Sequence, residues 1–297
     1  MSTGTIDLHT HTTHSDGSAS PSELIELAGA QRARAVAITD HDTTAAVDAA
    51  RAAADRVGLE FVSGIEISAE YSPGTMHILG YCIDHESNSL ATRLDELKLA
   101  RETRNPQIAS LLQSLGLDVS YDEVAMLAGN KVIGRPHFAR VMIEKGYVAS
   151  IQEAFDRFLK KGAAAYVEKA RLSPAESIAL IHQAGGVAVL AHPYQLRLGS
   201  YQEADELIGE LAGIGLDGVE AVYSRHSLEE RAGYSEIAAR YNLLVTGGSD
   251  YHGSYKPDIS IVTGLGDLEV PYELLEAVKA RAARYQPAQR NDVLNVS

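Results

Sequence analysis

Four side chains that can bind a metal ion lie close together near the start of the chain, and they are His9, His11, His14 and Asp16. A single threonine separates His9 from His11, so in a β-strand both imidazoles point to the same side. Two parallel imidazoles beside a carboxylate are typical ligands of a divalent ion. The motif therefore predicts a metal centre at the end of a short first strand.

Other ligand-type residues follow or lie within apolar segments later in the chain. With the opening motif they form a set of nine candidate metal ligands: His9, His11, Asp16, His41, Glu66, His77, His192, Asp250 and His252. So many buried ionisable groups would be costly unless cations shared them. Nine donors are too many for one tetrahedral ion, so we expect two or three ions, with a carboxylate such as Glu66 bridging two of them. A ligand set of histidines and carboxylates suits Mn, Zn or Fe.

The candidate ligands lie at or near the ends of predicted strands. Seven strands are predicted, over residues 5–11, 35–39, 60–67, 76–83, 186–191, 218–223 and 243–248. Helical patterns separate most of them, and two of these helices begin with a Ser-Pro-x-Glu capping pattern, at residues 20–23 and 173–176. This alternation predicts a parallel sheet covered on both faces. Ligands at strand ends are typical of the active face of a closed (β/α) barrel.

Residues 90–164 interrupt the alternation, because they contain helical patterns and no convincing strand. A long helix is predicted over 90–115, with a break at Asn105-Pro106, and shorter helices over 121–128, 135–145 and 151–160. Insertions of this length usually carry function. We therefore predict a metal-binding barrel formed by residues 1–89 and 165–297, and a helical cap formed by residues 90–164 over its active-site face.

The bulk composition limits the class of protein. A net charge of −14 argues against broad non-specific binding of nucleic acid through a basic face. The single cysteine, Cys82, excludes an internal disulfide framework. No apolar run approaches the length of a transmembrane helix, and the N-terminus lacks the pattern of a secretory signal. We therefore expect a cytoplasmic enzyme that does not associate with a membrane and has no known protein partner.

Five short motifs carry most of these candidate ligands. They are the run at residues 7–17, Ile-Thr-Asp-His-Asp at 38–42, Gly-Ile-Glu at 64–66, Ala-His-Pro at 191–193 and Gly-Ser-Asp-Tyr-His at 248–252. These motifs resemble the sequence blocks of the polymerase and histidinol phosphatase (PHP) family, and the resemblance spans nearly the whole chain. It implies a distorted (β/α)7 barrel related to the amidohydrolases, with two or three divalent ions. We expect manganese, with zinc and iron as alternatives.

By position, the resemblance also assigns the ligands to individual ions. The first ion would bind His9, His11, Glu66 and Asp250. The second would share Glu66 and bind His77 and His192. The third would bind Asp16, His41 and His252, and His14 has no place in this set.

Two neighbouring divalent ions lower the pKa of bound water and neutralise the charge of a phosphoryl group, which favours hydrolysis of a phosphate ester. We expect Asp16, Glu66 and His226 to be catalytic. Glu66 would bridge the ions, and an acid would protonate the leaving oxygen. Asp16, His14 and His226 are the candidates for this acid, and the sequence does not rank them.

Basic residues in the cap and after the sixth strand indicate a second anion-binding site. Arg135 and His137 belong to a Gly-Arg-Pro-His segment of the cap, and Arg225 and His226 follow the sixth strand. The planar arginine fork suits a phosphate that does not react. The cap segment resembles a PHP subgroup that removes the 3′-phosphate of nucleoside 3′,5′-bisphosphates, such as adenosine 3′,5′-bisphosphate, to leave the 5′-nucleotide. Some relatives of this subgroup also trim short RNA from its 5′ end.

Three alternative functions stay open at this point. A histidinol phosphate phosphatase, or a phosphatase for another small molecule, would use the same ligands without a second anion site. A metal-binding or proofreading module would have no hydrolytic activity, although all nine ligand positions are filled here. An amidohydrolase acting on a C–N bond often uses a carboxylated lysine, but no lysine lies at a predicted strand end.

Overall fold

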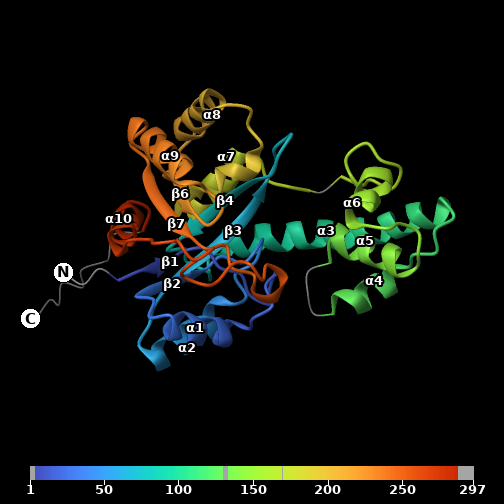
Figure 1. Ribbon diagram of the computed structural model, residues 1–297, viewed down its shortest axis with the longest axis horizontal. Coiled ribbons are helices and arrows are strands. Elements are labelled where there is room, and N and C mark those ends of the chain that lie inside the picture. The colour runs from blue at the N-terminus through green and yellow to red at the C-terminus, as the bar shows by residue number, and fades with distance from the viewer. Residues whose placement is uncertain (1–3, 130–132, 169, 287–297) are drawn as a thin grey trace, which may run out of the picture.

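The computed structural model describes residues 4–129, 133–168 and 170–286. Seven strands form a single sheet in chain order: β1 (Ile6–Asp7), β2 (Ala35–Ile38), β3 (Glu60–Ala69), β4 (Met76–Tyr81), β5 (Val187–Leu190), β6 (Gly218–Tyr223) and β7 (Leu244–Gly248). The two edges of the sheet approach each other, because the Leu8 N–H donates to the Gly247 carbonyl (3.2 Å) and Thr10 pairs with Tyr251. The result is the nearly closed, distorted seven-stranded barrel that the resemblance implies (Figure 1).

The sheet is not entirely parallel, so the prediction of a parallel sheet is wrong at β4. This strand runs antiparallel to both of its neighbours, β3 and β5. Only residues 70–75 separate β3 from β4, and a parallel crossover needs a dozen residues or more. The reversal has a consequence for the site. It places His77, near the start of β4, opposite Ser68, near the end of β3, and therefore on the rim where the parallel strands end.

Helices cover the outside of the barrel: α1 (Pro21–Ala30), α2 (Val47–Val57), α7 (Pro174–Gln183), α8 (Tyr201–Gly213), α9 (Leu228–Arg240) and α10 (Tyr272–Ala282). Both predicted capping boxes are present, at the start of α1 and of α7. Apolar side chains such as Ile6, Leu8 and Val189 fill the barrel interior. Leu275 and Val278 of α10 pack into the same cluster, so this helix, which the sequence patterns did not predict, completes the core.

The helical segment forms a smaller lobe beside the barrel (Figure 1). It contains α3 (Asn88–Ser114), α4 (Tyr121–Ala128), α5 (Arg135–Glu144), α6 (Ile151–Ala154) and the π-helix η1 (Phe155–Leu159). Contrary to prediction, α3 continues through Pro106. Packing holds the helix on both sides of the proline, because Leu90 lies in a barrel cluster and Ile108 lies in a separate cluster of the helical lobe. This lobe therefore has its own small core, and α3 connects it to the barrel.

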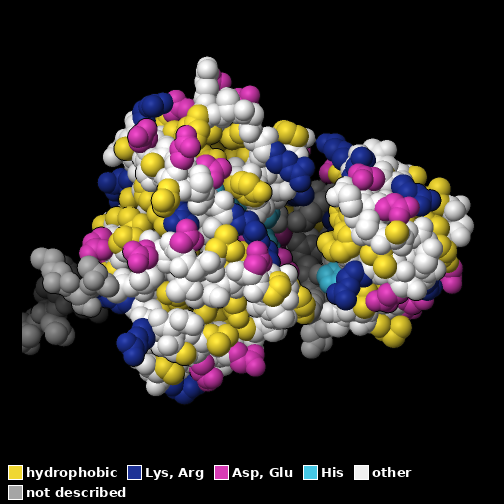
Figure 2. All heavy atoms as spheres, viewed as in Figure 1, with side chains coloured by type: hydrophobic (Ala, Val, Ile, Leu, Met, Phe, Trp, Pro, Cys, Tyr) yellow, Lys and Arg dark blue, Asp and Glu magenta, His cyan; other side chains and the backbone are white. Residues whose placement is uncertain are grey.

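The molecule is hollowed between the two lobes, and Lys and Arg side chains lie on both walls of the cleft (Figure 2). A cap cavity of about 340 Å³ is lined by Arg104, Arg135 and Phe155 of the helical lobe and by His41 of the barrel. A central cavity of about 520 Å³ adjoins it and reaches His192, Asp250 and His252. Two short 3₁₀ turns, η2 (Pro193–Leu196) and η3 (Gly253–Tyr255), lie along the barrel rim. Among the described residues, no helix is long and apolar enough to span a membrane.

Candidate metal centre

A buried carboxylate, that of Glu66, lies at the middle of the barrel rim with five imidazoles around it. The ring nitrogens lie 2.7 to 3.3 Å from its two oxygens, and they belong to His77, His192, His11, His41 and His9 in order of increasing distance. His77 and His192 face Oε1, whereas His9, His11 and His41 face Oε2. With one oxygen turned toward each histidine group, Glu66 has the arrangement that a bridging carboxylate requires.

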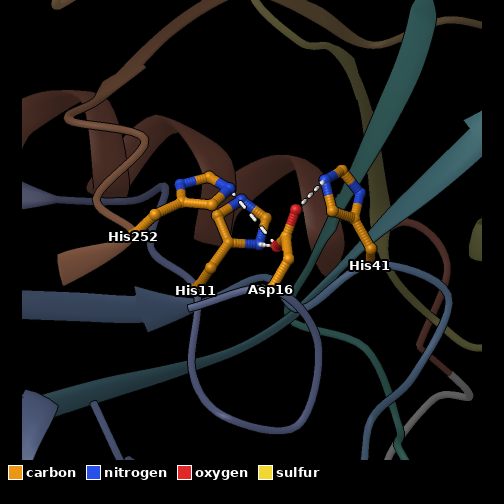
Figure 3. A group of neighbouring side chains, drawn as sticks. All are labelled: His11, Asp16, His41 and His252. Atoms are coloured by element: carbon orange, nitrogen blue, oxygen red, sulfur yellow. Dashed lines mark ion pairs between the residues drawn. The ribbon is translucent and has the colours of Figure 1, made fainter. Parts of the chain in front are cut away.

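A second group of ligands surrounds the carboxylate of Asp16 (Figure 3). Asp16 lies between His41 on one side and His11 and His252 on the other. Its oxygens are 3.3 Å from His252 Nε2, 3.6 Å from His11 Nδ1 and 3.7 Å from His41 Nε2. The Asp16 side chain is 55% exposed, so this end of the centre opens to the cleft.

Asp250 completes a third group with the two histidines of the opening motif. Its Oδ1 lies 3.4 Å from His11 Nε2 and 3.6 Å from His9 Nε2, and the two Nε2 atoms lie 3.1 Å apart. His9 and His11 thus face one point as the sequence predicts, although the regular strand ends before them, at Asp7. The other oxygen of Asp250 accepts hydrogen bonds from Lys256 (2.7 Å) and Tyr223 (3.0 Å).

All nine predicted metal ligands therefore lie together. They form overlapping groups whose ligand atoms are within 4.8 Å of one another: His11, Asp16, His41 and His252; His9, Glu66 and His192; His9, His11 and Asp250; His41, Glu66 and His77. The groups overlap more than the expected assignment does. His11 also belongs to the group around Asp16, and His9 to the group of Glu66 and His192. His41 contacts both Asp16 and Glu66. His14 is exposed and belongs to none of these groups.

Burial and neighbouring charges have opposite effects on the pKa values of the carboxylates and imidazoles in this centre. Burial opposes ionisation of Glu66, but the surrounding histidines, His41 and His77 foremost, hold its pKa well below the usual range. Burial also opposes protonation of His11, yet hydrogen bonds to Asp250 and Glu66 outweigh it and raise the His11 pKa to about 9. Burial dominates at His41 and lowers its pKa to about 3. The metal-free centre therefore carries protons at positions where an ion would otherwise supply positive charge.

Two ring nitrogens of the donor set lack hydrogen-bond partners, which bears on whether the set fits a metal ion. The Nδ1 atoms of His11 and His41 are buried and make no hydrogen bond within the described part of the chain. Each nevertheless lies near a carboxylate oxygen, at 3.6 Å from Asp16 and 3.2 Å from Glu66 respectively. When these histidines are neutral, their ring lone pairs and the carboxylate oxygens converge without a donor between them, which is the arrangement that a cation satisfies. The residues present thus fit divalent ions.

Glu220 binds two of the candidate ligand residues, and it was not among the predicted site residues. One oxygen lies 2.9 Å from His9 Nδ1, and the other accepts the backbone N–H of His192 at 2.8 Å. A carboxylate that accepts from Nδ1–H leaves Nε2 free of its proton and oriented for a metal. The available signal was a carboxylate within an apolar strand, since Glu220 lies inside β6 and is fully buried.

The cap residues Arg135 and His137 line the cap cavity, and His137 also lines the central cavity. Arg135 donates to the Val167 carbonyl (3.1 Å), and its guanidinium carbon lies 4.5 Å from the centre of the Tyr166 ring. His137 Nδ1 accepts the Gly134 N–H (3.1 Å), so the neutral ring carries its proton on Nε2. Arg104, which the sequence patterns did not single out, is buried and lines the same cap cavity.

Arg225 and His226 lie away from the ligand groups. Arg225 forms an ion pair with Asp258 (2.7 Å) beside a third cavity. His226 is buried, with Nδ1 bound to the Ala221 carbonyl (2.9 Å) and Nε2 accepting the Tyr194 N–H (3.4 Å). Both ring nitrogens are thus occupied by backbone groups, and the structure does not bring His226 among the candidate catalytic residues.

Comparisons with known proteins agree with this geometry. A 3′,5′-nucleoside bisphosphate phosphatase from Chromobacterium violaceum is 34% identical over 83% of this chain and 87% of its own length. A 5′-3′ exoribonuclease from Haemophilus influenzae is 35% identical over 83% of this chain and 89% of its own. A solved structure from Bifidobacterium adolescentis, described as a metal-dependent phosphoesterase, has a TM-score of 0.77 at 32% identity and covers 94% of this chain and 96% of that one.

These relatives and the histidine–carboxylate clusters support a hydrolase that acts on phosphate esters. The match to a family model is broad, since the model of the PHP domain covers residues 7–218. That range includes the opening motif, Glu66 and His192, which follows β5. The chain therefore belongs to the PHP domain family.

Proposed function

We propose that the protein is a metal-dependent phosphatase that removes the 3′-phosphate of nucleoside 3′,5′-bisphosphates, and that it also trims short RNA from the 5′ end. The observation that carries this proposal is the position of Glu66. It lies among five imidazoles on the floor of a cleft whose opposite wall carries Arg104 and Arg135. One site for reactive phosphate therefore faces one site for a second anion. The names of two relatives, a bisphosphate phosphatase and an exoribonuclease, support both substrates.

The nine ligands would hold the ions, which when bound supply an activated water and neutralise the charge of the reacting phosphoryl group. The chain provides the geometry for this chemistry. Glu66 turns one oxygen toward His192 (2.9 Å) and the other toward His11 (3.1 Å), so it joins two ligand groups. Lys256 and Tyr223 hold the orientation of Asp250 by binding its second oxygen. These contacts fix the ligands before an ion binds.

The cap would position the rest of the nucleotide. Arg104 and Arg135 line a cavity that also contains Phe155, so a 5′-phosphate would meet the guanidinium groups while the base meets an apolar ring. His137 lines both the cap cavity and the central cavity. With its proton on Nε2, His137 would donate a hydrogen bond to a phosphate oxygen. The distance between reactive and non-reactive phosphates would thus be set by the cleft.

The test is release of inorganic phosphate by protein that is stripped of metal and then reloaded with Mn²⁺, Zn²⁺ or Fe²⁺. The substrates are adenosine 3′,5′-bisphosphate, adenosine 3′-monophosphate, histidinol phosphate and a short 5′-phosphorylated RNA, whose cleavage is followed by chromatography. We expect the bisphosphate to give adenosine 5′-monophosphate, with a higher kcat/KM than either monophosphate. A preference for histidinol phosphate, or no release from any substrate with any ion, would refute the proposal.

A further inference from the structure

A third cavity, of about 810 Å³, borders the metal centre on the side away from the cap. We call it the η2 groove and define it by Tyr194, Gln195, Arg197, Arg225 and Lys256. It shares Gln195 and Lys256 with the central cavity. It shares no lining residue with the cap cavity among the described residues. The three cavities therefore follow one another in the order cap, centre and groove.

The groove carries both cations and an exposed aromatic ring. Arg197 is exposed and forms no ion pair within the described part of the chain. Arg225 is 38% exposed beside its partner Asp258, and Tyr194 is 53% exposed at the rim. Glu230 also lines the groove, but its carboxylate is bound to the Ser227 N–H (2.7 Å) at the start of α9. Cationic side chains with an aromatic face are the combination that binds single-stranded nucleic acid.

The groove is held in a defined shape by contacts on both sides of η2. The Tyr194 N–H donates to His226 Nε2 (3.4 Å), and the Thr75 N–H donates to the Gln195 carbonyl (3.0 Å). The backbone enters and leaves the turn in the left-handed region, with φ of 23° at His192 and 56° at Arg197. Non-glycine residues occupy this region only where the surroundings impose it. His226 thus contacts the backbone at the start of η2.

Lys256 and Tyr223 connect the groove to the centre. Both donate to Asp250, whose other oxygen faces His9 and His11. A phosphate at the centre thus has the cap on one side and the groove on the other. A nucleoside 3′,5′-bisphosphate ends at its reactive phosphate and fills only the cap and the centre. An RNA strand continues beyond that phosphate and needs a further site.

We propose that the η2 groove binds the nucleotide on the 3′ side of the reactive phosphate in an RNA oligonucleotide. Tyr194 stacks on its base, and Arg197 and Arg225 contact the following phosphate. This inference rests on the proposed function, because it takes the 5′-nucleotide to occupy the cap. It explains how one centre serves a small bisphosphate and a longer strand, and it gives Arg225 a role outside the metal centre.

The experiment compares two substrates in the Mn²⁺-loaded protein: a 5′-phosphorylated pentaribonucleotide and adenosine 3′,5′-bisphosphate. The readout is the ratio of their kcat/KM values in Tyr194→Ala, Arg197→Gln and the matched control Arg157→Gln. Arg157 is exposed on the cap and pairs with Glu153. We expect Tyr194→Ala to lower kcat/KM for the pentaribonucleotide about tenfold relative to kcat/KM for the bisphosphate, which is the effect of losing one stacked base. Arg157→Gln should leave the ratio unchanged.

Binding of a fluorescent pentaribonucleotide to the metal-stripped protein gives a second readout, by anisotropy at several salt concentrations. Arg197→Gln should reduce the slope of log Kd against log salt by about 0.7, the value for one phosphate contact with a single strand. A ratio and a salt slope that do not change in the groove variants would overturn the inference. An equal loss for both substrates would also overturn it, because the groove would then hold the 5′-nucleotide.

These outcomes are distinguishable from failure of the proposed function. If the wild-type protein releases no phosphate from the bisphosphate, the proposed function fails, and the anisotropy arm still decides whether the groove binds RNA. If the bisphosphate is hydrolysed but the pentaribonucleotide is neither bound nor cleaved, the groove inference and the RNA-trimming activity fail, whereas the bisphosphate phosphatase activity stands.

Discussion

Glu220 lies directly behind His9, and its Oε1 is 2.9 Å from His9 Nδ1, with both side chains fully buried. The second oxygen of Glu220 accepts the His192 N–H. A glutamine at this position can accept only one of these two hydrogen bonds, because its amide nitrogen is a donor. We expect Glu220→Gln to weaken metal binding about 10- to 100-fold without unfolding the protein.

A metal titration followed by elemental analysis measures this effect. Glu210→Gln, on an exposed position of α8, is the matched control and should bind metal like the wild type. Unchanged metal affinity in Glu220→Gln would show that this carboxylate does not orient His9.

The raised pKa of His11, about 9 against an ordinary 6.5, predicts opposite pH dependences for the metal-free and the loaded protein. In the metal-free protein, the protonated His11 contributes stability that is complete below pH 6.5 and is lost as pH rises through about 9. Its melting temperature should therefore fall between pH 6.5 and about 8.5. Metal affinity should rise over the same range, because the ion displaces the proton.

Scanning calorimetry of stripped and Mn²⁺-loaded protein tests both signs. His11→Asn should weaken the pH dependence of the stripped protein. It should not abolish the dependence, because, although burial opposes protonation of His9, Glu220 also holds the His9 pKa well above its usual value. A melting temperature that rises with pH in the stripped wild type would contradict the assignment of a proton to His11.

Gly17 positions the loop that carries Asp16. A Cβ atom at residue 17 would lie 2.2 Å from the His11 carbonyl oxygen, so Gly17→Ala must displace this loop. We propose that Asp16, His41 and His252 hold an ion of their own, and on this proposal we expect the variant to bind one ion fewer than the wild type. Activity should drop about 100-fold if that ion contacts the substrate.

The matched control is Gly213→Ala in α8, where a Cβ would meet no atom within 4 Å. Elemental analysis that gives the same metal content for Gly17→Ala and the wild type would contradict the role given to the loop.

We expect Arg135 to distinguish substrates that carry a 5′-phosphate from substrates that do not. Arg135→Gln should lower kcat/KM for adenosine 3′,5′-bisphosphate at least about tenfold, since a charge-assisted contact is lost. Turnover of adenosine 3′-monophosphate should change much less. Arg135 also binds the Val167 carbonyl. Arg135→Lys keeps the charge but loses the fork, so its kcat/KM for the bisphosphate should lie between the values of the wild type and Arg135→Gln. Equal losses for both nucleotides would indicate a structural role instead.

The clustering of the nine candidate metal ligands could be predicted because strand ends carry active sites in barrels. The direction of β4 was missed, although His77 itself pointed to it. This residue lies at the start of its strand, and in a parallel strand it would face the opposite end of the barrel. The connection of residues 70–75 is too short for a parallel crossover and allows only a hairpin. The antiparallel direction of β4 could therefore have been predicted from the sequence.

Other features could not be read from the sequence because they depend on contacts between distant segments. Glu220 is 211 positions from His9, and nothing in the local pattern of β6 indicates this pairing. Arg104 lies in a long helix where a charged residue is expected to be solvated, yet the fold buries it beside the cap cavity. His226 follows a strand as several of the candidate ligands do, but its ring turns toward the backbone of Ala221 and Tyr194.

The central claim is that Glu66 joins the ligand groups into one multinuclear centre. The most direct measurement is metal content and phosphate release of Glu66→Gln, beside Glu70→Gln, an exposed residue just beyond β3. We predict that Glu66→Gln binds less metal and loses activity toward adenosine 3′,5′-bisphosphate, whereas Glu70→Gln matches the wild type. Normal metal content together with full activity in Glu66→Gln would contradict the account.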